Sequence, residues 1–287
     1  MYKALNYWVY GGYTGVKTPY EFIDFAAEQQ IDGVEMTVSD CIKPEISESE
    51  CRAIAAYAAE KNVGLRTLAT DFYWRYSLTS DDASERSAAM EFSRKYLHIA
   101  HWMNVETVLF IPGAARVPWD PSKKAVSYEK VWARSKAAIE ELIPLAEDLN
   151  VNLALENVWN RFLFSPMEWK YYLEQFSSPK VGMYFDVANC CIYLPPQDYI
   201  GILGSRIKAI HIKNFTGSDC AGGLHGFGDD ILQGDVDFNA VHEALKNSSC
   251  DVPLTAEMVP FSRLPDMVLP DEELAAVTCQ KLKTLFN

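Results

Sequence analysis

The sequence predicts an α/β protein, a closed (β/α)8 barrel (TIM barrel) built as a single domain from residues 1–287. Eight short apolar segments alternate with eight longer amphipathic segments, which is the pattern of parallel strands joined by helices. The length of 287 residues suits one such barrel, which typically needs about 250 residues. No GxGxxG motif follows the first apolar segment, so the main sequence support for a doubly wound dinucleotide-binding sheet is missing.

Each expected strand is a short apolar run, and each is followed by a segment with helical periodicity. The strands are predicted at Ala4–Val9, Gly33–Met36, Gly64–Ala69, Glu106–Ile111, Asn152–Glu156, Val181–Asp186, Ile207–Lys213 and Pro253–Met258. The helices are predicted to begin near Pro19 and then to span Ser47–Lys61, Ala83–Asn104, Tyr128–Asn150, Pro166–Phe176, Gln197–Leu203, Phe238–Lys246 and Asp271–Phe286.

Local signals support the boundaries of several of these elements. Pro19 suits a first helical turn, where the amide would be unpaired in any case. Ser47 is followed three residues later by Glu50, which is the pattern of a capping box. Residues 71–82 and 216–235 are expected to form long loops at the carboxyl ends of strands, which is the face of a barrel where active sites lie.

Composition excludes several classes of partner. The formal net charge is −13, and basic residues occur in no cluster larger than short pairs such as Lys123-Lys124, so we expect no nucleic-acid partner. No apolar stretch approaches the roughly 18 residues that a membrane span needs, and the first residues lack the pattern of a signal peptide. The seven cysteines include no CxxC pair, which favours reduced thiols and a cytoplasmic location.

Four polar residues lie at or near the carboxyl ends of four successive predicted strands: Glu156, Asp186, His211 and Glu257. In a barrel these ends meet at one rim, so three carboxylates and an imidazole are expected to converge. Carboxylates packed together raise one another's pKa, and a cation removes that conflict. An oxygen-rich set with one His predicts a single divalent metal ion, with Mn²⁺ favoured and Mg²⁺, Co²⁺ or Zn²⁺ as alternatives.

Each of these residues taken singly has an ordinary structural explanation. A lone His in a strand is usually a hydrogen-bonded core residue, Asp186 could cap the turn that follows it, and Glu156 could pair with an arginine. Four such residues at consecutive strand ends favour the metal site.

The chain also resembles the xylose-isomerase-like TIM-barrel superfamily of sugar and sugar-phosphate isomerases and epimerases. Within it, the most similar branch is that of the L-ribulose-5-phosphate 3-epimerases and hexulose-6-phosphate isomerases. The segments that carry the resemblance are GVEM (33–36), LATDFYWRYSLTS (68–80), FIPG (110–113), LALENVWNRFLFSP (153–166), VGMYFDVAN (181–189), IKAIHIKNF (207–215), GDVDF (234–238) and LTAEM (254–258).

The resemblance implies that Glu156, Asp186, His211 and Glu257 bind one metal ion, and that Glu156 and Glu257 are the catalytic acid and base. The chain departs from the family pattern twice. Asp186-Val187-Ala188-Asn189 replaces Asp-x-Gly-His or Asp-x-Gly-Asn, and His211-Ile212-Lys213-Asn214 replaces His-x-Lys-Asp. Neither change removes a metal ligand, but both bear on substrate choice.

The predicted function is therefore metal-dependent isomerisation or epimerisation of a small sugar or sugar phosphate through an enediolate. One alternative is an inosose-dehydratase-like lyase, and another is a non-catalytic barrel that binds metal and sugar. An endonuclease IV-like activity is disfavoured by the five histidines in total and by the net charge. Analogy with related barrels predicts a homodimer.

Seven further residues are candidates for substrate binding. They are Glu35, Trp74, Arg75, Asn157, Asn189, Lys213 and His225. Trp74 and Arg75 equally suit a surface aromatic loop, whereas for His225 a solvated loop position is favoured over a substrate contact. The Gly-rich segment at 216–228 offers backbone amides for a phosphate or could form a lid, so phosphorylation of the substrate stays open.

Overall fold

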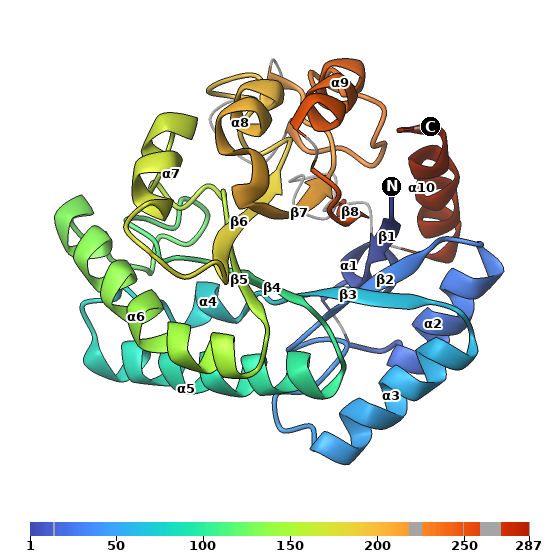
Figure 1. Ribbon diagram of the computed structural model, residues 1–287, viewed down its shortest axis with the longest axis horizontal. Coiled ribbons are helices and arrows are strands. Elements are labelled where there is room, and N and C mark those ends of the chain that lie inside the picture. Colours follow the sequence, from blue (N-terminus) through green and yellow to red (C-terminus); the bar gives the residue numbers. More distant parts are fainter. Residues whose placement is uncertain (14, 218–225, 249, 259–270, 287) are drawn as a thin grey trace.

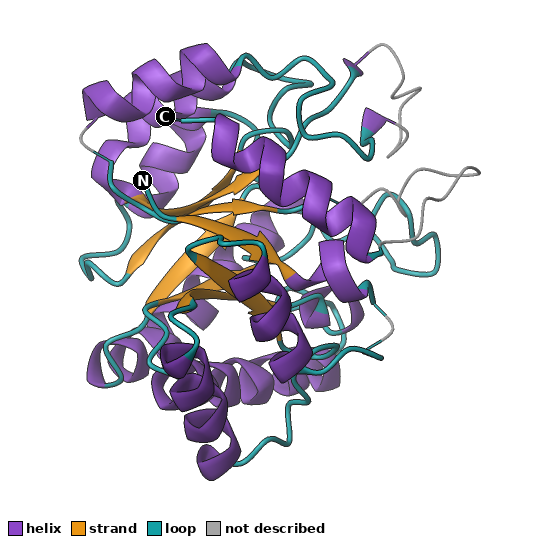
Figure 2. Ribbon diagram, turned by 90° about the vertical axis from the view of Figure 1, so that its right-hand side faces the viewer, coloured by secondary structure: helices purple, strands orange, loops and turns teal. Residues whose placement is uncertain are grey.

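The computed structural model describes residues 1–13, 15–217, 226–248, 250–258 and 271–286. Eight parallel strands close into a barrel in sequence order, with β8 pairing back to β1, and helices surround them (Figures 1 and 2). The predicted (β/α)8 barrel is thereby confirmed. The strands are β1 Lys3–Asn6, β2 Gly33–Thr37, β3 Gly64–Ala69, β4 Thr107–Phe110, β5 Asn152–Glu156, β6 Val181–Asp186, β7 Ile207–Ile212 and β8 Leu254–Ala256.

The helices that connect the strands lie close to the predicted positions. They are α2 Pro19–Glu28, α3 Glu48–Glu60, α5 Ala83–Trp102, α6 Tyr128–Asp148, α7 Pro166–Leu173, α8 Pro196–Leu203, α9 Phe238–Ser248 and α10 Glu272–Thr284. A 3-10 turn, Gly204–Arg206, follows α8. None of the described helices is long and apolar enough to span a bilayer.

The predicted strand at Ala4–Val9 is wrong in its second half. The strand ends at Asn6, and the next residues form a short helix, α1 Tyr7–Gly11. The Asn6 side chain accepts a hydrogen bond from the Trp8 amide at 2.7 Å and so caps this helix. The run Tyr7–Gly11 is buried throughout, and an apolar run of this kind does not distinguish strand from helix by its pattern alone.

The predicted loop after β3 also contains a helical turn, α4 Phe72–Arg75. Phe72 stacks on Phe92 of α5, with ring centroids 3.9 Å apart, which fixes this turn against the neighbouring helix. Trp74 and Arg75 therefore lie on a short helix rather than in an irregular loop.

The capping box that the sequence predicted at the start of α3 is confirmed. The Ser47 hydroxyl accepts from the Glu50 amide at 3.3 Å, and the Glu50 carboxylate accepts from the Ser47 amide at 2.9 Å. Helix α2 begins in the same way, with Thr18 and Glu21 as the capping box and Pro19 in the first turn.

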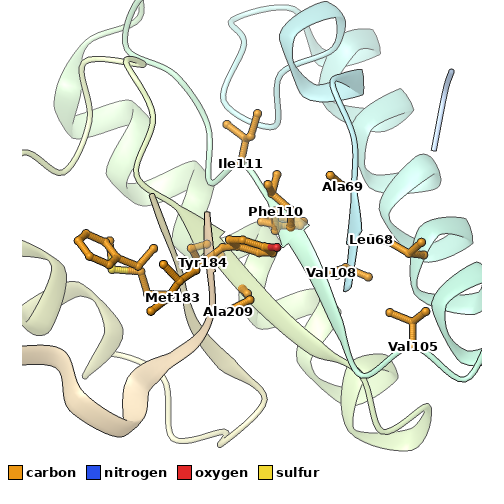
Figure 3. Packing of buried hydrophobic residues seen from close by; sticks show 14 of the residues in the cluster. Leu68, Ala69, Val105, Val108, Phe110, Ile111, Met183, Tyr184 and Ala209 are labelled. Carbon is orange, nitrogen blue, oxygen red and sulfur yellow. The ribbon is translucent and has the colours of Figure 1, made fainter. Parts of the chain in front are cut away.

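Side chains along a strand point alternately into the barrel interior and outward to the helices, so residues of the site and residues of the outer core alternate in sequence. Figure 3 shows part of the buried cluster, in which Met183 and Tyr184 leave β6 on opposite sides. Phe185 stacks on Tyr199 of α8, at a centroid distance of 5.3 Å, so it faces the helical layer. Asp186 is then directed to the barrel interior, on the same side of the strand as Tyr184.

Candidate metal centre

The four residues at the carboxyl ends of β5 to β8 converge in the structure. One ligand atom from each of Glu156, Asp186, His211 and Glu257 lies within 4.8 Å of the others, and all four residues are buried. The register explains this convergence, because Asp186 and His211 are Cα partners and the Glu257 amide donates to the Ile212 carbonyl at 3.1 Å. Among the described residues, this is the group of His, Cys, Asp and Glu side chains that could hold a metal ion.

His211 is oriented by a partner on the far side of the barrel. Its Nε2 lies 2.7 Å from the Glu35 carboxylate, while its Nδ1 faces the Glu156 carboxylate at 3.1 Å. Glu35 is held in turn by the side-chain amide of Asn6, whose Nδ2 donates at 2.7 Å, and by the Tyr184 hydroxyl. Because Nε2 is used by Glu35, Nδ1 is the nitrogen left to bind a metal.

The two carboxylate oxygens of Asp186 have different partners: one caps the following turn, and the other faces the site. Oδ1 accepts from the amides of Ala188 and Asn189 at 2.9 and 2.8 Å, so the residue does cap the turn that follows it. Asn157 holds the backbone of Asp186 by two reciprocal hydrogen bonds, each 2.8 Å long. Asp186 Oδ2 is left to face the other ligands.

Lys213 brings a buried positive charge to the same place. Its Nζ lies 2.6 Å from Glu257 Oε2 and 2.8 Å from Asp186 Oδ2, and 5.0 Å from the centre of the Phe227 ring. The ammonium therefore offsets part of the repulsion between these carboxylates.

The buried carboxyl groups differ in their affinity for protons. Burial raises the pKa of Glu156 to about 7, against a hydrogen bond from His211 that lowers it. Burial also raises the pKa of Asp186, although Lys213 opposes the change. The pKa of Glu257 is lowered, because the Lys213 and His211 charges outweigh the effect of burial. Burial would lower the pKa of His211, but the Glu257 and Glu35 charges hold it well above its usual value.

This donor set fits a divalent ion. Ligands on opposite sides of an ion such as Mg²⁺ lie about 4.2 Å apart, given metal–oxygen distances of about 2.1 Å. The separations of up to 4.8 Å between the four ligand atoms approach that value. Three carboxylates with one imidazole suit a hard or borderline divalent cation, as the sequence predicted.

A cavity of about 370 Å³ lies beside the four candidate ligands, and six of its lining residues are aromatic. Glu156, Glu257 and Lys213 contribute to its lining, so groups of opposite charge face the space where a ligand would bind. The remaining lining residues are Trp8, Tyr13, Thr70, Asp71, Trp74, Ile111, Trp119, Val158, Trp159, Asn189 and Phe227. A cavity of this size lies within the range of small-molecule sites.

The predicted substrate-binding residues are placed differently from one another. Trp74, Asn189 and Lys213 line the cavity, whereas Asn157 lies behind it as a support for Asp186. Glu35 is fully buried and bonded to His211. Arg75 is exposed to solvent on α4 and does not line the cavity. The remaining candidate, His225, lies outside the described residues.

Several cavity residues were not expected from the sequence. Trp8 lies in α1, within the run predicted as a strand, and its indole N–H donates to Asp40 at 2.9 Å. Trp119 lies in the loop between β4 and α6, for which the sequence predicted no role. Its ring meets that of Trp74 edge to face, with ring centroids 4.7 Å apart. Trp159 follows the candidate ligand Glu156 by three residues, and its indole N–H donates to the Asn189 carbonyl at 3.1 Å. The sequence feature that could have identified these three cavity residues is a tryptophan within a predicted strand or shortly after one.

Comparisons with known proteins agree with this architecture. The family described as xylose isomerase-like TIM barrel matches residues 23–285. SgbU of Escherichia coli (strain K12), provisionally named an L-ribulose-5-phosphate 3-epimerase, is 24% identical over 194 residues. The matched region covers 64% of this chain and 63% of SgbU, so it spans less than two thirds of that relative.

Solved structures of sugar epimerases share the fold along the whole chain. D-psicose 3-epimerase from Clostridium cellulolyticum H10, solved with D-tagatose, gives a TM-score of 0.83 at 17% identity and covers 100% of both chains. A D-psicose 3-epimerase solved in the presence of D-fructose gives a TM-score of 0.80 at 18% identity, covering 100% of this chain and 99% of that one. At these identities the likeness shows a common fold.

Proposed function

The chain belongs to the xylose isomerase-like TIM-barrel family, and on that premise we propose that it is a metal-dependent sugar or sugar-phosphate epimerase. The reaction is inversion at the carbon beside the carbonyl of a ketose, by proton transfer through an enediolate. The names of relatives, which include L-ribulose-5-phosphate and D-psicose 3-epimerases, support a ketose as the substrate class.

One observation carries this proposal. Glu156 and Glu257 both border the cavity, and they enter the site from β5 and from the end of β8, with β6 and β7 between them. Inversion needs one group to remove a proton and another to return one to the opposite face of the intermediate. Two carboxylates separated by the site suit that requirement better than a single one.

The other residues hold this pair in place. Lys213 keeps the Glu257 carboxylate at 2.6 Å, and His211 contacts Glu156 at 3.1 Å, so neither carboxylate rotates freely. Trp74 and Trp159 supply flat apolar walls that exclude water and suit the C–H faces of a sugar.

A metal ion held by Glu156, Asp186, His211 and Glu257 would supply Lewis-acid polarisation of the substrate carbonyl. One glutamate then removes the proton beside that carbonyl, and the other delivers a proton to the opposite face.

Proton exchange with solvent tests the proposal directly. Mn²⁺-loaded protein is incubated in D₂O with a panel of ketoses and ketose phosphates, and the products are followed by NMR. We expect deuterium at the carbon beside the carbonyl, with exchange lost after EDTA treatment. Absence of exchange on the whole panel, with metal bound, would contradict the proposed function. Loss of water from a cyclic polyol ketone, detected by mass spectrometry, would instead support the dehydratase alternative.

The Glu257→Gln variant provides the matching test of the catalytic pair. The amide keeps the size of the side chain and one oxygen ligand but cannot accept the proton, so exchange should be abolished while the fold is largely kept. Glu273→Gln, on the exposed surface of α10, is the control and should exchange at the normal rate. An active Glu257→Gln variant would overturn this assignment.

A further inference from the structure

A second cavity, of about 510 Å³, adjoins the first at Trp74, which lines both. Most of its lining comes from residues 77–82, which follow α4, and from residues 114–126, which follow β4. Both loops follow the carboxyl ends of strands, so this cavity lies at the same end of the barrel as the candidate metal centre. None of the four candidate metal ligands lines it, so its role is separate from theirs.

Two of the three carboxylates in this lining are paired with cations of the protein. The Asp81 carboxylate lies 2.7 Å from the Arg134 guanidinium and 3.2 Å from the Lys130 ammonium. The Glu85 carboxylate lies 3.2 Å from the Lys123 ammonium. Because a neighbouring cation offsets each of these charges, neither carboxylate strongly repels an anion that enters the cavity.

Two cations of the lining, Arg116 and Lys124, have no such partner. Among the residues that the structure describes, neither side chain makes a hydrogen bond or an ion pair. The third acid, Asp82, uses Oδ1 to cap α5, where it accepts from the Ser84 amide at 2.8 Å. Within the described part of the chain, the lining therefore presents two unpaired cations and one unpaired carboxylate. This local excess of positive charge contrasts with the net charge of −13 of the chain and favours an anionic ligand.

The backbone that carries the two cations is held at several points. The amides of Ala115 and Arg116 both donate to the Asn160 carbonyl, at 2.9 and 3.2 Å, and Asn160 is fully buried. The Val126 amide donates to the Ala115 carbonyl at 2.9 Å, so the segments that carry Arg116 and Lys124 lie side by side. A backbone fixed in this way reduces the conformational entropy that is lost when the side chains bind a ligand.

The Ser80 hydroxyl adds a neutral donor to the same lining. Its Oγ accepts from the Asp82 amide at 3.1 Å, and among the described residues no acceptor takes its O–H. A guanidinium donates to two phosphate oxygens through its planar fork, and an ammonium binds phosphate as a point charge. Two cations and a hydroxyl therefore suit a phosphate, whereas a neutral sugar ring would leave both charges unpaired.

We propose that the second cavity is an anion-binding site in which Arg116 and Lys124 bind a phosphate group, with the Ser80 hydroxyl as a further donor. The site goes beyond the proposed function, because it binds phosphate whether or not the barrel epimerises sugars. It places the phosphate after β3 and β4, whereas the sequence suggested backbone amides at 216–228, after β7. The phosphate belongs either to the far end of a substrate that extends past Trp74 or to a separate phosphorylated metabolite.

Binding of inorganic phosphate tests the site. Mg²⁺-loaded protein is titrated with inorganic phosphate in a calorimeter at low ionic strength. We expect affinity to fall about tenfold in Arg116→Ala and by a smaller factor in Lys124→Ala, because each variant removes a charge-assisted hydrogen bond. Arg52→Ala, which removes the same charge from an exposed position on α3, is the matched control and should leave the affinity unchanged.

Two results would overturn the site. One is the absence of phosphate binding, or equal binding by the wild-type protein and Arg116→Ala. The other is binding that EDTA abolishes and Arg116→Ala retains, which would assign the phosphate to the metal ion. Both substituted side chains are exposed, so the variants should fold, and thermal melting checks that they do.

Competition identifies the source of the phosphate. Bound D-fructose 6-phosphate is challenged separately with inorganic phosphate and with D-fructose. Displacement by both would show that one molecule extends from the first cavity into the second and carries the phosphate. Displacement by only one of them would assign the site to a separate phosphorylated metabolite.

The phosphate site and the proposed function can fail independently. Phosphate binding that depends on Arg116, without deuterium exchange on any ketose, would support the site and contradict the epimerase function. Deuterium exchange without phosphate binding at Arg116 would support the epimerase function and contradict the site.

Discussion

Glu35 illustrates how a single buried side chain acquires its role from partners distant in sequence. The sequence offered Glu35 as a candidate for substrate binding, but it lies in the middle of β2 and its oxygens are taken by Asn6, Tyr184 and His211. A carboxylate bonded to the free nitrogen of a metal-binding His fixes the ring orientation and makes the other nitrogen a better ligand. Glu35 is therefore a positioning residue in our proposal, rather than a contact for a sugar hydroxyl.

Replacing Glu35 should weaken metal binding without touching a ligand. We expect Glu35→Gln to reduce Mn²⁺ affinity by about 10- to 100-fold, because the bond that orients His211 is lost or reversed. Calorimetric titration with Mn²⁺ measures this. Tyr184→Phe, which removes one hydrogen bond to Glu35 and leaves its charge, should cause a smaller loss. Unchanged affinity in Glu35→Gln would exclude the positioning role.

Metal affinity should depend on pH in a defined direction. In the metal-free protein, the pKa of Glu156 is raised to about 7 and that of His211 is held well above its usual value, so both groups must release protons when metal binds. Affinity should therefore rise with pH, with Kd falling about tenfold per pH unit below 7 for each proton displaced. Titrations from pH 6 to 8, in buffers with different ionisation enthalpies, would report both Kd and the protons released. A Kd that is constant over this range would contradict the prediction.

At the scale of elements, the start of the chain shows how local capping redirects a segment. Asn6 ends β1, caps α1 through the Trp8 amide and donates to Glu35. Asn6 therefore helps to place Trp8, which lines the cavity, and also holds Glu35, which orients His211. An uninterrupted strand to Val9 would have been equally apolar but would not have formed this connection.

The capping box of α3 offers a prediction on stability alone. Ser47→Ala should lower the free energy of unfolding by about 1 kcal/mol, because the Glu50 amide loses its acceptor. Denaturant unfolding measures the change, and deuterium exchange on substrate should be unaffected since α3 is remote from the ligands. Ser87→Ala, at an exposed position inside α5, is the control and should not lower stability, because alanine has the higher helix propensity. Equal effects from the two variants would argue against the cap.

At the scale of the whole molecule, the barrel brings together charges that only a bound ion would fully compensate. Lys213 and His211 offset part of the repulsion among Glu156, Asp186 and Glu257. A metal that binds only the folded state adds its binding energy to the stability of the entire domain.

Metal removal should therefore lower the melting temperature. With free Mn²⁺ at 100 times its Kd, the gain is about 2.7 kcal/mol, which corresponds to roughly 4–5 °C for a chain of this size. Thermal scans with added Mn²⁺ and with EDTA measure the difference, and Glu257→Gln should show a smaller one. The same melting temperature in both conditions would show that the four residues hold no metal.

The amino-acid sequence was sufficient to predict the order of the elements, the closed barrel and the family, all of which are confirmed. It also placed Glu156, Asp186, His211 and Glu257 at one rim, because parallel strands all deliver their carboxyl ends to the same face. These features depend on local periodicity and on strand direction, and both can be read along a single chain.

The partners of those residues were decided only by the tertiary structure. The bond between Glu35 and His211 spans 176 positions, and the pair formed by Lys213 and Glu257 spans 44. Trp8 and Trp119 reach the cavity through a capped turn and a loop whose conformations depend on what they pack against. Periodicity identifies which face of a strand is buried, but closure of the barrel determines which buried groups meet.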